Sequence, residues 1–233
     1  MQSQHARNGV RRLSCTTLAL QGFVSLREAD YFADHGFTDI LYAVGITQNK
    51  MNHVAGLMKR GVKLTVILDS LDAAHMLVRV AREMPGPLHG LIEIDCDGHR
   101  AGILPESADL LAVADVLATG GVVVKGVMTH AGGSYECRSD AALRASAEQE
   151  RVRTVRAARR LRTAGHAAPV VSVGSTPTAL FAQDLNGVTE VRVGAQLRIL
   201  PNHACATGAQ HARYHLIDAS PVITAQWERF SGW

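Results

Sequence analysis

Short hydrophobic runs alternate along the chain with longer segments whose hydrophobic residues recur at helical spacing. The runs are nearly continuous, which is typical of parallel strands covered on both faces. We expect strands at residues 40–44, 64–68, 91–95, 122–127, 170–173 and 188–191. We expect helices at residues 26–35, 48–59, 69–83, 107–117, 140–163 and 178–183. Regular alternation of the two predicts β/α units around a parallel sheet.

The pattern favours a barrel over an open doubly wound sheet, because no Gly-x-Gly-x-x-Gly motif opens a helix. Residues 1–23 have no clear period, and Arg11-Arg12 does not resemble a barrel strand. Beyond residue 192, β-like pieces at 196–200 and 214–218 indicate a small all-β unit. The predicted fold is α/β, an incomplete (β/α) TIM-type barrel with a small C-terminal all-β domain. Its parts are an irregular segment 1–23, a barrel 24–192 and a β-domain remnant 193–233.

Composition is that of a soluble globular protein, with 47% hydrophobic and 19% charged residues in a chain of 233. No hydrophobic run approaches the ~20 residues of a membrane-spanning helix, and the first residues lack the apolar core of a secretory signal. Four scattered cysteines fit reduced thiols, so we expect a cytoplasmic protein.

The helix expected at 140–163 has seven arginines between Arg144 and Arg162. Its hydrophobic stripe, which includes Ala147, Ala158 and Leu161, indicates that the arginines lie on the solvated outer face of a barrel helix. A net charge of +3 is too small to imply a nucleic-acid partner. We therefore expect neither nucleic acid nor membrane as a partner.

A strand, a glycine, two hydroxyl residues and a proline precede the helix expected near residue 178. Hydroxyl residues and proline are typical of a helix start, where free amides bind anions. Gly174, Ser175 and Thr176 are therefore candidates for a phosphate site, which barrels typically place after a late strand. An ordinary helix cap without a ligand is the alternative.

His203 and Cys205 lie two residues apart, on one face if this segment is extended. Imidazole and thiolate form a soft pair that prefers zinc, with two coordination positions left for other ligands. The alternative is a free cysteine beside a hydrogen-bonded histidine.

Polar residues also crowd the ends of two expected strands. Glu93, Asp95, Asp97, His99 and Arg100 follow one of them, where Arg100 could hold a phenolate or carboxylate. A solvated loop with a structural ion pair is equally compatible with this pattern. His130 and Tyr135 follow the next strand, with two glycines between them that allow close backbone approach.

Several ordered motifs together resemble the D-serine dehydratase and D-threonine aldolase group of fold type III pyridoxal-phosphate enzymes. They occupy residues 43–46, 97–102, 129–135, 174–178, 201–207 and 231–233. The resemblance implies an alanine-racemase-like barrel followed by a β-domain. It also implies a small D-amino acid as substrate and a homodimer.

The resemblance assigns roles residue by residue. Gly174, Ser175 and Thr176 would hold the cofactor phosphate, and Arg100 would approach its phenolic oxygen. His130 and Tyr135 would line the cofactor and substrate pocket. His203 and Cys205 would bind a catalytic metal, zinc in the dehydratases. The implied reaction is loss of the β-hydroxyl from D-serine or a related D-β-hydroxy amino acid.

Two departures from the family pattern bear on activity. The family's Schiff-base lysine would lie upstream of Val24, yet residues 1–23 contain no lysine, so no catalytic residue is assigned. Lys50, Lys59, Lys63 and Lys125 lie on other elements and do not match. The chain is expected to be truncated at its N-terminus and shortened between residues 192 and 194, where relatives carry more of the β-domain.

Two alternatives to the dehydratase stay open. One is a D-threonine aldolase, which would cleave the substrate to glycine and an aldehyde. The other is a non-catalytic remnant that binds pyridoxal phosphate, which the missing lysine favours. Cys205 favours the dehydratase over the aldolase, because a carboxylate ligand would suit manganese or magnesium better.

Overall fold

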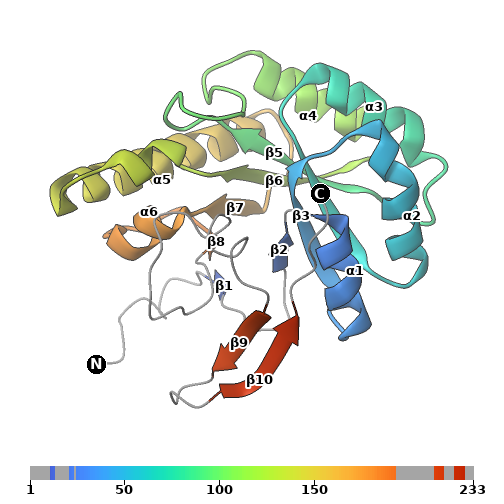
Figure 1. Cartoon of the computed structure of the whole chain (residues 1–233). Coiled ribbons are helices and arrows are strands. Elements are labelled where there is room, and N and C mark those ends of the chain that lie inside the picture. Colours follow the sequence, from blue (N-terminus) through green and yellow to red (C-terminus); the bar gives the residue numbers. More distant parts are fainter. Residues whose placement is uncertain (1–10, 14–20, 24, 193–212, 218–222, 229–233) are drawn as a thin grey trace.

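The computed structural model describes residues 11–13, 21–23, 25–192, 213–217 and 223–228. Eight parallel strands form one curled sheet in the order β1-β8-β7-β6-β5-β4-β3-β2 (Figure 1). Their bounds are β1 Arg11–Leu13, β2 Gln21–Phe23, β3 Asp39–Gly45, β4 Lys63–Leu68, β5 His89–Ile94, β6 Val123–Thr129, β7 Val170–Val173 and β8 Glu190–Arg192. This order follows the chain around a barrel, so the predicted fold class is confirmed.

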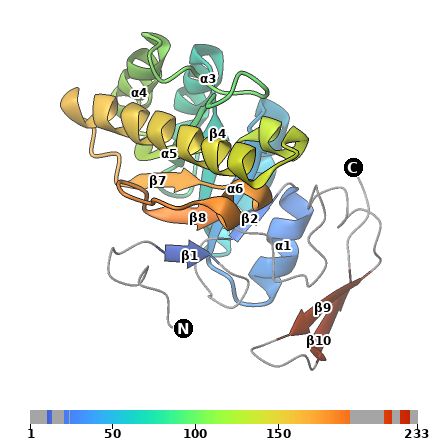
Figure 2. The same cartoon turned by 90° about the vertical axis from the view of Figure 1, so that its left-hand side faces the viewer.

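Helices cover the outer face of the curled sheet, as Figures 1 and 2 show from two sides. Their bounds are α1 Leu26–Asp34, α2 Met51–Lys59, α3 Leu71–Ala81, α4 Asp109–Thr119, α5 Asp140–Thr163 and α6 Thr176–Phe181, with 3-10 turns η2 Gln48–Lys50 and η3 Gly132–Glu136. The predicted helices are confirmed within a few residues. In the described ranges, no helix is long and apolar enough to cross a membrane.

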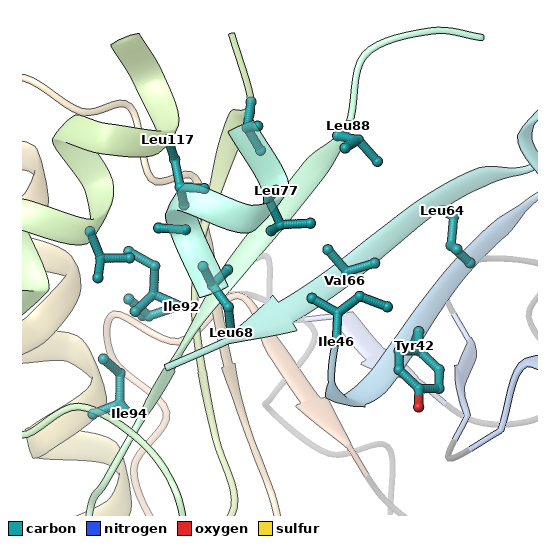
Figure 3. Close-up of a cluster of buried hydrophobic side chains, with 14 of the residues drawn as sticks. Tyr42, Ile46, Leu64, Val66, Leu68, Leu77, Leu88, Ile92, Ile94 and Leu117 are labelled. Atoms are coloured by element: carbon teal, nitrogen blue, oxygen red, sulfur yellow. The ribbon is translucent and has the colours of Figure 1, made fainter. Parts of the chain in front are cut away.

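Hydrophobic side chains fill both sides of the sheet. The larger cluster lies between the strands and the helices and includes Tyr42, Leu77 and Leu117 (Figure 3). A smaller cluster of Leu41, Ile67, Leu91 and Met128 fills the inside of the barrel. Burial on both faces explains why the strands read as nearly continuous hydrophobic runs.

The segment predicted to be irregular contributes two short strands. Arg11 and Arg12, predicted not to resemble a barrel strand, belong to β1, which pairs with β8, and Gln21–Phe23 pairs with β3. Three residues are too few for a periodic pattern to be visible in the sequence. β1 and β2 are the two ends of the sheet, and no pairing between them is recorded for the described residues, so the barrel is incomplete.

A separate antiparallel hairpin of β9 Arg213–Ile217 and β10 Ile223–Glu228 follows the barrel. It confirms the strand expected at 214–218, whereas the piece expected at 196–200 lies outside the described residues. The domain boundaries at 23 and 192 stay predictions.

Gly126 allows β6 and β7 to approach closely. It has φ +139°, and a Cβ atom there would overlap the carbonyl oxygen of Val170. We expect Gly126→Ala to lower the free energy of unfolding by more than ~2 kcal/mol through backbone strain and overlap. Gly56→Ala, at an exposed helical position with nothing within 4 Å of the added Cβ, is the control. This control substitution should raise the free energy of unfolding by about 0.5–1 kcal/mol. Urea unfolding measures both, and equal effects would contradict this account.

Candidate functional site

Three loops at the carboxyl-terminal edge of the barrel carry the predicted site residues. Arg100 follows β5, His130 and Tyr135 follow β6, and Gly174–Thr176 follow β7. Because β5, β6 and β7 are neighbours in the sheet, their loops are adjacent. The structure therefore brings together the residues that the sequence proposed for the cofactor.

The β5 and β6 loops interlock through a carboxylate and a glycine. Asp97 Oδ2 accepts a hydrogen bond of 2.9 Å from the Gly133 amide. The aliphatic part of Arg100 lies so close to Gly132 that a Cβ atom there would be 2.7 Å from Arg100 Cγ and Cδ. Because Gly132 has no side chain, the exposed Arg100 can lie directly against the backbone of the β6 loop.

His130 and Tyr135 form one wall of the site. Their rings are stacked, with centroids 5.8 Å apart and planes inclined by 22°. Both are half-buried, and the 3-10 turn η3 returns Tyr135 to His130. Two adjacent rings at a strand end can pack against a planar ligand.

The β7–α6 loop is a helix start whose polar groups already have partners. The Ser175 hydroxyl is 2.9 Å from Thr178 Oγ1 and 2.7 Å from the hydroxyl of Ser134. The Gly174 amide donates to Glu150. Within the described part of the chain, the hydroxyl of the half-buried Thr176 has no hydrogen-bond partner. Of the three predicted phosphate ligands, Thr176 therefore has the available side chain.

Glu150 and Arg192 were not among the predicted site residues, yet they organise this edge. Glu150 is 2% exposed, and its Oε1 accepts hydrogen bonds of 3.1 Å from the amides of both Ala131 and Gly174. Arg192 donates to the carbonyl oxygens of Thr129 and Gly174 and to the Ser172 hydroxyl. The spacing of α5 could have revealed Glu150, which lies on the helix's buried stripe. Successive side chains of a strand point to opposite faces of the sheet, so the outward-facing Val191 could have placed Arg192 on the inner face of the barrel.

Burial shifts the acid–base behaviour of several groups here. It raises the pKa of the Glu93 carboxyl, and the nearby Asp69 raises it further, while Arg100 and Arg192 lower it. Burial also raises the pKa of the Cys96 thiol to about 12, so this thiol stays protonated at neutral pH.

None of the four lysines lies with the predicted cofactor residues. Lys50 donates to the hydroxyl of Tyr42, whose side chain is in the cluster between sheet and helices. Lys59 ends α2, Lys63 begins β4, and Lys125 lies in the first half of β6, toward the opposite edge of the barrel. All four lysines of the sequence are thereby accounted for.

The predicted metal ligands His203 and Cys205 lie outside the described residues. Among the residues that the structure does describe, no group of three or more His, Cys, Asp or Glu side chains could hold a metal ion.

A family model described as alanine racemase, N-terminal domain, matches residues 8–199. The chain belongs to this family. It is 48% identical over 171 residues to D-threo-3-hydroxyaspartate dehydratase of Delftia sp. (strain HT23), which is 73% of this chain and 45% of that protein. It is 28% identical over 161 residues to D-serine dehydratase of Dictyostelium discoideum, 66% of this chain and 40% of that protein. The resemblance found in the sequence is confirmed.

Solved structures agree with this family assignment. The Delftia dehydratase superposes with a TM-score of 0.75 at 42% identity, over 81% of this chain and 54% of that chain. Two further structures of a D-threo-3-hydroxyaspartate dehydratase are a metal-free form of a cysteine-to-alanine variant and a histidine-to-alanine variant, the two substituted residues being two positions apart. D-Threonine aldolase from Filomicrobium marinum shares the fold, with a TM-score of 0.67 at 20% identity over 74% of this chain and 47% of that chain. The chain spans about half the length of these relatives.

The raised pKa of Glu93 gives a pH dependence of stability with a defined sign. The folded state binds the Glu93 proton more tightly than the unfolded state, so this group's contribution to stability falls as pH rises above 4.5. We expect Glu93→Gln to remove that part of the decline, measured by urea unfolding between pH 4.5 and neutral pH.

Glu148→Gln is the matched control. It should change the pH dependence of stability in the opposite direction, because a hydrogen bond from Arg151 lowers the pKa of the Glu148 carboxyl. Its stabilising contribution is present above pH 4.5 and lost on acidification. If Glu93→Gln changed the pH profile in the same direction as Glu148→Gln, the account of the buried carboxyl would be wrong.

Proposed function

We propose that this chain is the cofactor-binding barrel of a pyridoxal-phosphate-dependent lyase that acts on D-β-hydroxy amino acids, of the D-serine dehydratase type. The observation that carries the proposal is the meeting of Arg100, His130, Tyr135 and the Gly174–Thr176 loop at three adjacent strand ends. The 48% identity to a D-threo-3-hydroxyaspartate dehydratase supports a dehydratase in particular. The aldolase alternative has weaker support, with 23% identity to a 3-hydroxy-D-aspartate aldolase.

The residues present fit the phosphate and the ring of this cofactor. The free hydroxyl of Thr176, at the start of α6, would bind the phosphate, at a place where barrels often bind one. His130 and Tyr135 would pack along the ring, and the Arg100 guanidinium would balance the charge of the phenolic oxygen. Bound in this way, pyridoxal phosphate supplies the electron sink that makes the substrate Cα acidic.

The positions of the lysines favour a second candidate function. No lysine side chain accompanies the proposed pocket, so we propose that this polypeptide holds the cofactor by noncovalent contacts. A binding protein of that kind would have no turnover. Formation of a 2-keto acid and ammonia from D-serine or D-threo-3-hydroxyaspartate would identify the dehydratase, whereas glycine would identify the aldolase.

Binding of pyridoxal phosphate tests the proposal. We expect Thr176→Val to raise the dissociation constant of pyridoxal phosphate about tenfold, the effect of losing one hydrogen bond to a charged group. The affinity for pyridoxal, which has no phosphate, should not change. Thr163→Val, at an exposed position in the last turn of α5, is the matched control and should bind both compounds normally.

Fluorescence titration gives these affinities. Borohydride reduction in the presence of pyridoxal phosphate, followed by peptide mass spectrometry, should find no single lysine that is labelled dominantly. Wild-type protein without affinity for pyridoxal phosphate would overturn the proposed function. One dominantly labelled lysine would overturn the noncovalent mode of binding.

We also propose that His203 and Cys205 bind zinc. Their spacing equals that of the histidine and cysteine substituted in the related dehydratase, whose cysteine variant has a structure in the metal-free form. Imidazole and thiolate are preferred zinc ligands, and bound zinc would polarise the leaving hydroxyl.

The zinc proposal predicts that His203→Ala and Cys205→Ala each lower bound zinc, measured by atomic absorption after dialysis, by at least about tenfold. Cys137→Ala removes a half-buried thiol that directly follows η3 and should leave the zinc content unchanged. Equal zinc content in all three variants would contradict the assignment.

A further inference from the structure

A carboxylate from the outer helix layer reaches the loops that carry the proposed cofactor site. Glu150 lies in the first half of α5, yet its side chain is 2% exposed. Burying a carboxylate is unfavourable unless hydrogen bonds replace its hydration. Its hydrogen-bond partners therefore indicate what the carboxylate does.

Those partners are backbone amides in two different loops. Oε1 accepts from Ala131 in the β6–η3 loop and from Gly174 in the β7–α6 loop, each at 3.1 Å. Ala131 directly follows His130, and Gly174 directly precedes Ser175 and Thr176. One carboxylate oxygen thus joins the loop of the ring wall to the loop of the phosphate site.

Two further contacts join the same loops. The hydroxyl of Ser134, which donates to the Ala131 carbonyl oxygen, lies 2.7 Å from that of Ser175. From the inside of the barrel, Arg192 donates to the carbonyl oxygens of Thr129 and Gly174. Glu150 and Arg192 therefore bind the same two backbone segments, 129–131 and 174. Glu150 binds their N–H groups, and Arg192 binds their carbonyl groups.

The surroundings of Glu150 match this arrangement. Burial raises the pKa of its carboxyl, whereas Thr178, Arg192 and the amides of Gly174 and Ala131 lower it. Three of these four groups lie at a strand end or in a loop, and the fourth, Thr178, lies in α6, which packs against α5. Anchoring α5 to the barrel alone would not require partners in both loops.

We infer that Glu150 is a positioning residue, which fixes the β7–α6 loop relative to the β6–η3 loop so that phosphate and ring are bound together. The inference rests on the proposed function, because it assumes that pyridoxal phosphate binds between these loops. Glu150 acts through the amides of Ala131 and Gly174 and does not itself contact the ligand.

Fluorescence titration with pyridoxal phosphate and with pyridoxal tests this role. Glu150→Ala leaves two buried amides without an acceptor, and its dissociation constant for pyridoxal phosphate should rise by about tenfold or more. Glu150→Gln keeps an acceptor oxygen in the same place and should restore the affinity to within about threefold of wild type. The ratio of pyridoxal phosphate affinity to pyridoxal affinity should fall only in the alanine variant.

Thr154→Ala is the matched control for loss of stability. Thr154 lies one turn further along the same buried face of α5, is fully buried, and donates to the Glu150 carbonyl oxygen instead of to a loop. It should lower the unfolding temperature without changing either affinity. Should Glu150→Ala fail to fold, Ser134→Ala provides the second variant, because it removes the hydroxyl bridge to Ser175, together with the hydrogen bond to the Ala131 carbonyl oxygen, and leaves Glu150 in place. It should weaken pyridoxal phosphate binding about threefold.

The outcomes separate the two proposals. Wild type that binds pyridoxal phosphate, together with Glu150→Ala or Ser134→Ala protein that binds it equally well, would overturn the positioning role and leave the proposed function standing. Loss of affinity in Glu150→Gln equal to that in the alanine variant would also overturn it. Wild type that fails to bind pyridoxal phosphate would overturn both.

Discussion

The backbone at Gly174 is held from two sides by opposite charges. Its amide donates to the Glu150 carboxylate, and its carbonyl oxygen accepts from the Arg192 guanidinium at 3.2 Å. Gly174 has φ +126°, and a Cβ atom there would overlap the backbone of Arg192. Neither charge could be buried alone without a large desolvation cost. The backbone groups that they bind supply the missing hydrogen bonds.

This arrangement determines the rest of the candidate site. The barrel strands fix where each loop begins, but hydrogen bonds between loops set how the loops lie against one another. Asp97 connects the β5 loop to Gly133, and Ser134 connects the β6 loop to Ser175. Glu150 and Arg192 then join β6 to β7 and β8. Residues from four consecutive strand ends thereby form one connected network around the proposed cofactor site.

The sequence predicts the repeating part of this structure well. Six strands and six helices follow from continuous hydrophobic runs and helical spacing, since burial on both faces imposes those patterns. β1 escaped prediction because three residues carry no period and its pairing with β8 joins distant parts of the chain. Arg100, His130, Tyr135 and Gly174–Thr176 were found because glycines and polar residues stand out after hydrophobic strands. Glu150 did not stand out, because it lies among seven arginines and only its place on the buried stripe marks it.

Amide hydrogen exchange in the wild-type protein tests the central claim most directly. If Glu150 holds both loops, the amides of Ala131 and Gly174 should exchange as slowly as those within β6 and β7, although both lie in loops. Addition of pyridoxal phosphate should slow them further, because a bound ligand stabilises the closed arrangement. Exchange of either amide at the rate of an exposed turn would contradict the account, because the carboxylate would then not be bound there.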